Sequence, residues 1–598
     1  MAAPPLVRQC DSDALSSRRL RSRASIGALR RPRPLVTALT ALLASACTCE
    51  RRAPGAAAPR PAATQAASAP EDWQLGRLPD SVRAGTPRAG GELVVGVDFE
   101  PASLNAIVTS DWLAKRIVLG RVYQALVTVD AADDPRYQII PQLAERWEVS
   151  PDGRTYTFHL RRDVKWHDGE SFSARDVLAT LDKVLDPKVD AASTRADFAE
   201  LARHHAPDEH TVVLEWKQPY FLVLDALSDL TIQPAHLIGN LDARAYNESA
   251  TNPLNRAPIG TGPFKLERWE SHSHISLVRN PAYWGRPAYL ERIVFRVIQD
   301  ASVRLQLAQR GEVDLLYRLK TEQWSRADTP ELRAQFHRSR FYAAKYNWIG
   351  WNLARPPLGD ARVRRALTLL IDRPAIIDKL LYGLPKPTTC HFYWASAACD
   401  PAQAPLPHDP GAAAALLDEA GVLDQDGDGL RDYQGKPFRF GLSLPANASE
   451  TARVATKIKE DLARAGIDMS IEKVEWSAFL QRVSAHDFDA IALMWSGDAR
   501  MDPTQVWHSS SIEGGSNYVG FRDAEADRLI EQARVTLDAA ARDALYRRFG
   551  AILQREQPYT FLYVLPELDL LHKRVRGARP GLYWWTFEDL WIASAEGS

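Results

Sequence analysis

The fold class is decided by residues 438–495, which read FRFGLSLPANASETARVATKIKEDLARAGIDMSIEKVEWSAFLQRVSAHDFDAIALMW. This stretch alternates short apolar runs that favour buried strands with longer segments that favour helices, and Gly466 ends the first helical segment. Strands that alternate with helices pair in parallel through right-handed crossovers. We therefore predict an α/β sheet with strands at 438–444, 467–474 and 488–495 and helices at 450–465 and 476–485.

A polar segment follows the last of these strands. Trp495 closes the apolar run, and Ser496, Gly497 and Asp498 come directly after it. In open α/β sheets the ligand site lies beyond the carboxyl ends of the strands. The segment therefore predicts a binding site at this edge of the sheet.

Two stretches nearer the N-terminus indicate further folded units. Residues 91–97 form a short apolar run bounded by glycines, which favours a buried strand. Residues 147–161 contain two alternating strands around Asp152-Gly153, a hairpin turn because both residues tolerate positive φ. Ser173 and Asp176 then form a capping box that begins a helix. Turn and cap chemistry explains these acidic residues better than catalysis does.

Length and charge limit the classes of protein to which this sequence can belong. At 598 residues the chain is too long for a single hydrophobic core, and it predicts about three to four folding units. Its 74 Lys and Arg nearly balance its 75 Asp and Glu, giving a formal net charge of −1. Because nucleic-acid binding needs a basic stripe, we expect no nucleic-acid partner.

The N-terminus has the features of an export signal. An arginine-rich region precedes the apolar run Leu35–Ala46, which is shorter than the ~20 residues of a permanent membrane span. Residues 43–47, Leu-Ala-Ser-Ala-Cys, resemble a lipobox, in which the signal is cleaved before a lipid-modified cysteine, although Ala44 stands where that motif prefers Leu. We predict a lipoprotein signal peptide over residues 1–46 and lipidation of Cys47. Simple cleavage or a retained anchor is the alternative.

The residues after Cys47 are rich in Ala and Pro as far as Pro70. A segment of this composition cannot bury a core and behaves as an extended tether. We therefore predict a tether over residues 47–89 and a folded body that begins near Gly90.

Only two cysteines, Cys390 and Cys399, lie inside the predicted folded body. An oxidising compartment would let them pair as a disulfide. The alternative is two unpaired thiols, and neither cysteine is placed like a catalytic nucleophile.

Two segments have candidate metal ligands. Residues 424–429 read DQDGDG and are similar to the start of a calcium loop, but Gly435 stands where the bidentate Glu of an EF-hand would lie. A polar turn is the favoured alternative. A second segment contains His204, His205 and His210, for which exposure to solvent is the simpler explanation. We expect no resident metal and no cofactor.

Four blocks of the body carry a family resemblance. The first contains Leu143-Ala144-Glu145 and Ser150-Pro151-Asp152-Gly153, and the third contains Gly260-Thr261-Gly262-Pro263-Phe264; the four cover residues 143–161, 164–177, 260–284 and 360–373. In their order and spacing these blocks resemble the family 5 solute-binding proteins of ABC importers, the peptide- and nickel-binding group.

The resemblance implies an α/β protein with the two-lobed periplasmic-binding-protein type II fold and an extra subdomain inserted in the first lobe (cluster C). Carried over by motif, the first lobe comprises residues 90–122, 255–342 and 568–598, the inserted subdomain residues 123–254, and the second lobe residues 343–567. The C-terminal return has local support, because Trp584, Trp585 and Trp591 need a core that the first-lobe sheet could supply.

The resemblance also implies a ligand site. In peptide-binding members an Asp in a Trp-x-Gly-Asp segment pairs with the α-ammonium of the ligand, and Trp495-Ser496-Gly497-Asp498 matches that segment. A carboxylate suits this task because it only accepts hydrogen bonds and forms charge-assisted ones with an ammonium. The alternative is that Asp498 caps a turn before Asp502. A second wall is expected from the loop after the first strand, at Thr109, Ser110, Asp111 and Trp112.

The leading hypothesis is a lipid-anchored receptor that captures oligopeptides or dipeptides between its lobes and delivers them to the permease subunits of an ABC transporter. It predicts a monomer in the periplasm, held by a lipid anchor on a bacterial membrane. A nickel complex, haem or an oligosaccharide is the alternative ligand. An exported hydrolase is the enzymatic alternative, but the sequence has no His-Glu-x-x-His helix, Gly-x-Ser-x-Gly elbow or phosphate-binding glycine loop. We therefore expect a binding protein and no enzyme.

Overall fold

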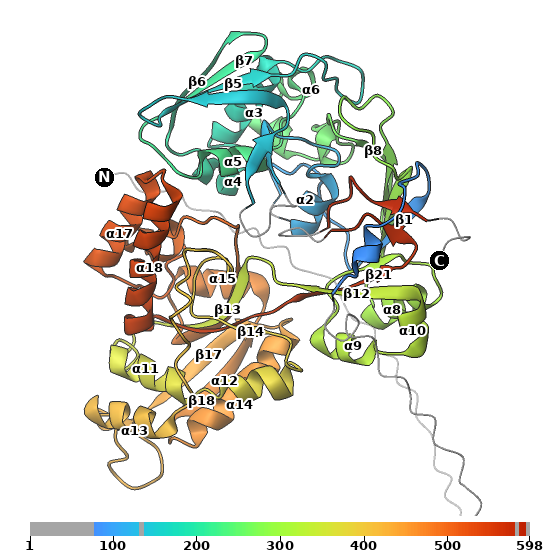
Figure 1. Cartoon of the computed structure of the whole chain (residues 1–598). Helices are drawn as coiled ribbons and strands as arrows, with labels where there is room; N and C mark the ends of the chain where they lie inside the picture. Colours follow the sequence, from blue (N-terminus) through green and yellow to red (C-terminus); the bar gives the residue numbers. More distant parts are fainter. Residues whose placement is uncertain (1–76, 110, 131–136, 580–584, 594–598) are drawn as a thin grey trace, which may run out of the picture. The chain divides into compact units, whose positions relative to one another are not determined.

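Three large sheets organise the part of the chain that the computed structural model describes, residues 77–109, 111–130, 137–579 and 585–593 (Figure 1). The predicted signal peptide, Cys47, most of the predicted tether, Ser110 and Trp584 lie outside the described residues. None of the described helices combines the length and the apolar character that a membrane span requires.

The first lobe is built on a seven-stranded mixed sheet. Its strand β1 (Glu92–Val97) confirms the strand predicted at 91–97 and pairs in parallel with β10 and β11. The strand order is β12 (Phe336–Phe341), β21 (Glu567–His572), β11 (Leu315–Leu316), β1, β10 (Arg292–Val297), β9 (His274–Arg279), β8 (Phe264–Glu270). Trp585 is buried in the core of this lobe, and Trp591 is a buried residue of the short strand β23 (Trp591–Ile592).

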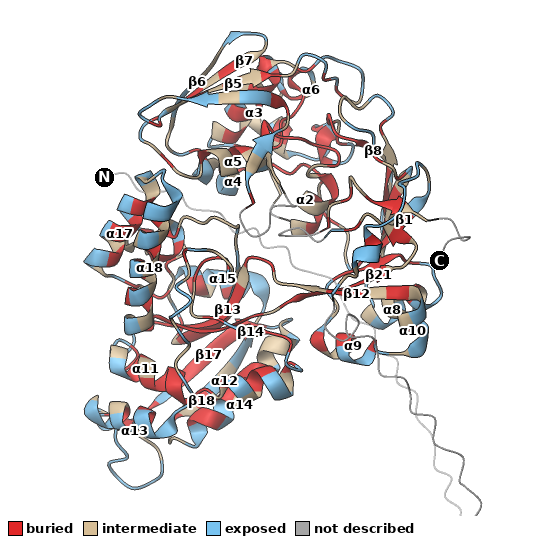
Figure 2. Ribbon diagram, in the orientation of Figure 1, coloured by how far each residue is buried: buried red, intermediate tan, exposed pale blue. Residues whose placement is uncertain are grey.

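The second lobe is built on a six-stranded sheet in which β13, β17 and β20 are almost entirely buried, among helices with exposed outer faces (Figure 2). Its strand β17 pairs in parallel with both β18 and β19, as the sequence predicts. The order is β14 (Lys386–Pro387), β20 (Tyr559–Val564), β13 (Lys345–Trp351), β19 (Ala490–Ser496), β17 (Arg439–Pro445), β18 (Asp468–Val474). The helices include α11 (Ala361–Leu370), α13 (Pro410–Glu419), α14 (Ser449–Ala463), α15 (Trp476–Ser484), α17 (Ala524–Val535) and α18 (Ala539–Glu556).

The inserted subdomain has its own antiparallel sheet and its own core. The sheet has the order β4 (Ala144–Val149), β5 (Thr155–Leu160), β7 (Thr211–Trp216), β6 (Leu201–Asp208). Gly153 has φ +69° in the β4–β5 turn, which confirms the predicted hairpin. The capping box of Ser173 and Asp176 begins α3 (Ala174–Leu185), as predicted. The subdomain also contains α4 (Ala192–Asp197) and α5 (Val223–Asp229).

Two strand connections join the lobes, from β12 to β13 and from β20 to β21. An ion pair ties them together: Lys345 Nζ lies 2.7 Å from Glu567 Oε1, and both side chains are 9% exposed. Arg318 of the first lobe lies 3.7 Å from the same carboxylate. Although burial alone raises the pKa of Glu567, the charges of Lys345, Arg318 and Arg116 lower it to about 2. The connection between the lobes therefore contains a paired, buried charge. The domain boundaries themselves remain a prediction.

Candidate ligand-binding site

Asp498 lies at the edge of the second-lobe sheet where three parallel strands end. Because β17, β18 and β19 run in the same direction, their carboxyl ends share one edge. Asp498 follows β19, and Trp476 follows β18 at the first residue of α15. Trp476 is 47% exposed, an uncommon state for so large an apolar side chain. The rule that indicates Asp498 also indicates Trp476 as a candidate site residue, because Trp476 follows the carboxyl end of the neighbouring strand β18.

The segment before Asp498 is held against the strand that enters from the first lobe. Gly497 N donates to Ala344 O at 2.7 Å, and β19 pairs with β13 from Ser496 to Ala490. The Trp495 indole stacks on Trp348 with ring centroids 5.8 Å apart, and its Nε1 donates to Tyr559 Oη at 3.4 Å. Trp495 is thus partly a core residue, and a ligand role for Ser496, Gly497 and Asp498 remains a prediction.

The residues after Asp498 are anchored separately. Asp502 accepts the backbone N–H of Thr504 at 2.9 Å and the Nε of Arg534 at 2.8 Å. Asp502 therefore fixes the residues that follow it, and the alternative role of Asp498, as the cap of a turn before Asp502, stays open.

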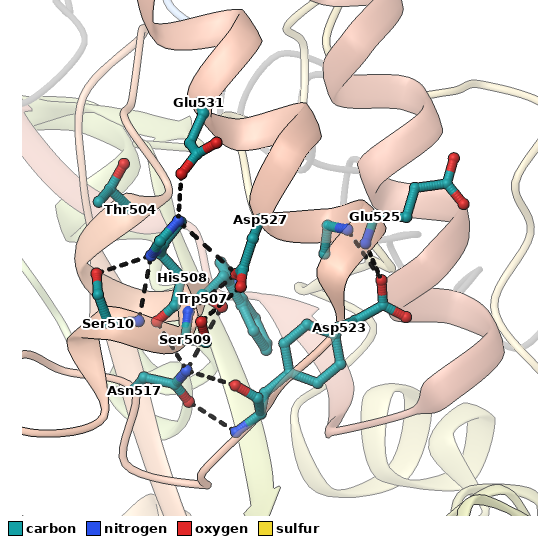
Figure 3. A network of polar contacts seen from close by, with 12 residues as sticks. Thr504, Trp507, His508, Ser509, Ser510, Asn517, Asp523, Glu525, Asp527 and Glu531 are labelled. Atoms are coloured by element: carbon teal, nitrogen blue, oxygen red, sulfur yellow. Dashed lines mark hydrogen bonds and ion pairs between the residues drawn. The ribbon is translucent and has the colours of Figure 1, made fainter.

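A polar network fixes the chain further downstream, between α16 (Thr504–Trp507) and α17 (Figure 3). Asp527 of α17 accepts Ser509 N at 2.9 Å and Ser509 Oγ at 2.5 Å. The Asn517 amide donates to the backbone oxygens of His508 and Phe521 at 3.1 and 2.8 Å. The loop that carries Asp498 is therefore attached to well-bonded structure on both sides.

Acidic side chains of the inserted subdomain interact with Asp498. Burial and then the charge of Asp498 raise the pKa of Asp197 to about 6. The same two causes raise the pKa of Asp229, against the opposing charge of Lys115. Burial also raises the pKa of Asp225, where Arg500 opposes and Asp498 adds to the shift. Carboxyl groups are thus concentrated around Asp498, and they come from α4, α5 and the loop after β19.

This acidic group is accessible to water. Asp197, Asp229 and Asp498 are all exposed, although surrounding protein atoms raise the pKa of the first two. Side chains that are open to water and also surrounded by many protein atoms lie in a recess of the surface. Asp229 also lines a cavity of about 450 Å3 with Tyr123 and Tyr137, and the described lining of that cavity includes no second-lobe residue. The arrangement is suited to attract a cationic group, because a positive charge relieves the repulsion between the carboxylates.

The loop that is predicted to form the second wall of the ligand site has structural roles. The Asp111 carboxylate caps α2 (Trp112–Val118) by accepting Leu113 N at 2.8 Å, and Thr109 Oγ1 accepts Asp111 N at 3.1 Å. The Trp112 ring meets Phe99 and Tyr317 edge to face, with centroids 5.5 and 5.6 Å apart. A ligand role for this wall remains a prediction.

Cys390 and Cys399 are joined by a disulfide with an S–S distance of 2.08 Å. The loop between them bears Phe392 and Tyr393, whose rings lie 4.5 Å from Tyr546 and 6.1 Å from Tyr137, respectively. The disulfide loop therefore contacts α18 and the segment after β2 (Val127–Val129).

The candidate metal segments differ in their geometry. Among the described residues, one group of metal-ligating side chains converges, with carboxylate oxygens of Asp424, Asp426 and Asp432 within 4.8 Å of one another. Backbone N–H groups of Gly427 and Gly429 donate to Asp424 at 2.8 and 3.1 Å, as in a polar turn. His204 instead pairs with Asp182 at 2.9 Å.

Comparison with known proteins identifies the family. Residues 138–517 match the family model described as bacterial extracellular solute-binding proteins, family 5 Middle. The oligopeptide-binding protein AppA of Bacillus subtilis (strain 168) is 30% identical over 497 residues, which cover 80% of this chain and 87% of that protein.

Solved structures agree with the sequence match. The structure of AppA from Bacillus subtilis in complex with a nonapeptide is 27% identical, with a TM-score of 0.72, and covers 85% of this chain and 100% of that one. NikA from Brucella suis in complex with Fe(III)-EDTA is 26% identical, with a TM-score of 0.75, and the match covers 84% and 100% of the two chains. The predicted two-lobed α/β fold is confirmed, and the chain belongs to the family 5 bacterial extracellular solute-binding proteins.

Proposed function

We propose that this protein is the receptor of an ABC importer, that it captures peptides with a free amino terminus, and that Asp498 binds their α-ammonium. The observation that carries the proposal is the position of Asp498 at the carboxyl edge of the second-lobe sheet, within range of three further carboxylates. The peptide-bound relative AppA supports the same ligand class.

A screen of ligand classes tests this proposal. Thermal shift and calorimetry on the body from Gly90 would compare peptide pools with metal chelates and oligosaccharides, because ligands that bind only the folded state raise its stability. Stabilisation by peptides is expected. Stabilisation by a chelate or a sugar, without any by peptides, would reject the peptide assignment.

The second candidate ligand is a metal chelate, which the likeness to NikA favours. Carboxylates around Asp498 would disfavour an anionic chelate and favour a cationic one. The same screen therefore separates the two candidates by ligand class, and chelates of opposite charge test whether the site prefers a cation.

Binding of a cationic ligand should release protons near neutral pH. A positive charge stabilises ionised carboxylates, so it lowers the raised pKa of Asp197 and Asp229 and removes their protons. Calorimetry at pH 6 to 7 in two buffers of different ionisation enthalpy measures the release. Identical heats in both buffers would contradict the prediction, and the Asp229→Asn variant should release less.

We also propose that Cys47 is lipidated and anchors the protein, in the periplasm, to a bacterial membrane. The acyl chains supply the membrane affinity, so the Cys47→Ser variant should appear in the soluble periplasmic fraction or persist as an unprocessed precursor. Fractionation and mass spectrometry of the N-terminus check this. A soluble wild-type protein whose N-terminus lies beyond Cys47 would overturn it.

A further inference from the structure

A turn of the inserted subdomain packs against the second lobe. Phe221, just before α5, donates its N–H to Arg534 O of α17 at 3.2 Å. Its ring lies under the guanidinium of Arg542 at 4.5 Å and meets the Tyr546 ring edge to face at 6.1 Å. The Phe221 side chain therefore joins the hydrophobic core of the second lobe, where Tyr546 is 2% exposed.

Charged contacts involve residues that precede and follow Phe221 in the chain. Arg500 donates to Asp225 Oδ1 of α5 through Nε at 2.8 Å, and Arg500 Nη1 donates to Tyr137 O at 3.1 Å. Both members of the Arg500–Asp225 pair are at least three-quarters buried, with 25% and 20% exposure. The Arg534 guanidinium lies 5.0 Å from the Tyr220 ring while it pairs with Asp502. These bonds are shielded from solvent screening, unlike exposed ion pairs.

A third contact comes from the hairpin of the inserted subdomain. A Cβ built on Gly153 would lie 2.6 Å from Leu537 Cδ1, in the connection between α17 and α18. The β4–β5 turn therefore touches the second lobe as well, and the three contacts form one continuous surface across α5, α17 and α18.

We propose that these contacts form a clasp that holds the inserted subdomain against the second lobe in the absence of ligand, and that Asp225 positions the loop carrying Asp498. The clasp consists of Tyr220, Phe221 and Asp225 on one side and Arg500, Arg534, Arg542 and Tyr546 on the other. None of its bonds requires a ligand atom. Arg500 stands two residues after Asp498, so a bond that holds Arg500 also restrains the ammonium-binding loop.

The clasp sets the fraction of ligand-free molecules in which the inserted subdomain is held against the second lobe. We call this arrangement the closed form. When only a fraction of the protein is competent to bind, the apparent dissociation constant rises by the inverse of that fraction. A variant without the clasp should therefore bind every ligand more weakly, by about tenfold if the closed fraction falls by that factor. This effect does not depend on the ligand class, whereas the positioning role of Asp225 rests on the proposed function.

Distance measurements on the ligand-free mature protein test the clasp. Labels on the exposed residues Arg203 and Lys436 report the separation of the inserted subdomain from the second lobe. The Phe221→Ala/Asp225→Asn variant should shift the distance distribution to longer values. The Arg548→Ala variant is the matched control, because Arg548 lies on α18 but pairs with the exposed Glu525. If the ligand-free distance distributions of the wild-type protein and the clasp variant coincide, the clasp is rejected. This conclusion holds whether or not the protein binds peptides.

Binding measurements test the positioning role. The Asp225→Asn variant should lose affinity for peptides with a free amino terminus beyond the loss it shows for N-acetylated peptides, and the swap Asp225→Arg/Arg500→Asp should restore part of it. Thermal unfolding of each variant confirms that it is folded. Equal losses for both peptide classes would reject positioning and leave only the closure effect. A wild-type protein that binds no peptide at all rejects the proposed function instead.

Discussion

We expect the Asp498→Asn variant to bind peptides with a free amino terminus at least about 30-fold more weakly than the wild-type protein does. The substitution keeps the volume of the side chain and removes its charge, so the ligand ammonium is desolvated against a neutral amide. Truncating one partner of a desolvated charge pair costs roughly 2 to 5 kcal/mol, and the lower value corresponds to about 30-fold in affinity. Isothermal calorimetry measures the change.

N-acetylated peptides provide the ligand control for this variant. They carry no ammonium, so they should bind the wild-type protein poorly and lose little more in Asp498→Asn. Asp487→Asn is the matched protein control, because the Asp487 carboxylate is exposed on the same lobe and pairs with Arg355 at 3.3 Å. If Asp498→Asn weakens both peptide classes equally, or neither, Asp498 has a structural role and the ammonium site lies elsewhere.

The second large effect is expected at the connection between the lobes. The Lys345→Met variant should be less stable by about 3 to 5 kcal/mol, because it leaves the Glu567 carboxylate buried without its partner. Chemical denaturation followed by fluorescence measures the loss. The double variant Lys345→Met/Glu567→Met should recover most of it, since a buried ion pair can be replaced by apolar groups at little cost. A Lys345→Met protein as stable as wild type would show that Arg318 alone satisfies Glu567.

The pH dependence of stability provides an independent check of this ion pair. The folded-state pKa of Glu567 is depressed to about 2 from an ordinary value near 4.5. A depressed carboxylate pKa contributes stability above the unfolded-state pKa, and the contribution is lost as the pH falls through the folded-state value. The wild-type protein should therefore lose this stability between about pH 4.5 and 2, and the Lys345→Met variant should show a smaller loss in that window.

Sequence patterns predicted the features that depend on neighbours in the chain. Gly153 in its turn and the capping box before α3 depend on residues a few positions apart, and the parallel strands β17 to β19 follow from their alternation with helices. The position of Asp498 beyond β19 follows from the same alternation.

Contacts between distant segments left no such local signal. Arg500 and Asp225 are 275 residues apart in the sequence, and Lys345 and Glu567 are 222 apart. Each of these residues alone looks like an ordinary surface charge, because nothing in its neighbourhood shows that the fold will bury it. The acidic surroundings of Asp498 could not be predicted for the same reason: Asp197 and Asp229 reach it only through the packing of the inserted subdomain.

The place of β21 in the first-lobe sheet has a consequence for the order in which the molecule folds. This strand lies between β12 and β11, so the sheet has a gap until residues 567–572 are available. The inserted subdomain and the second lobe have their own sheets upstream of that point. Domains generally fold as units as the chain emerges, and long-range strand pairing is slow. The first-lobe sheet is therefore completed after the other two, and its unpaired strand edges remain open to chaperones and to misassociation until residues 567–572 are available.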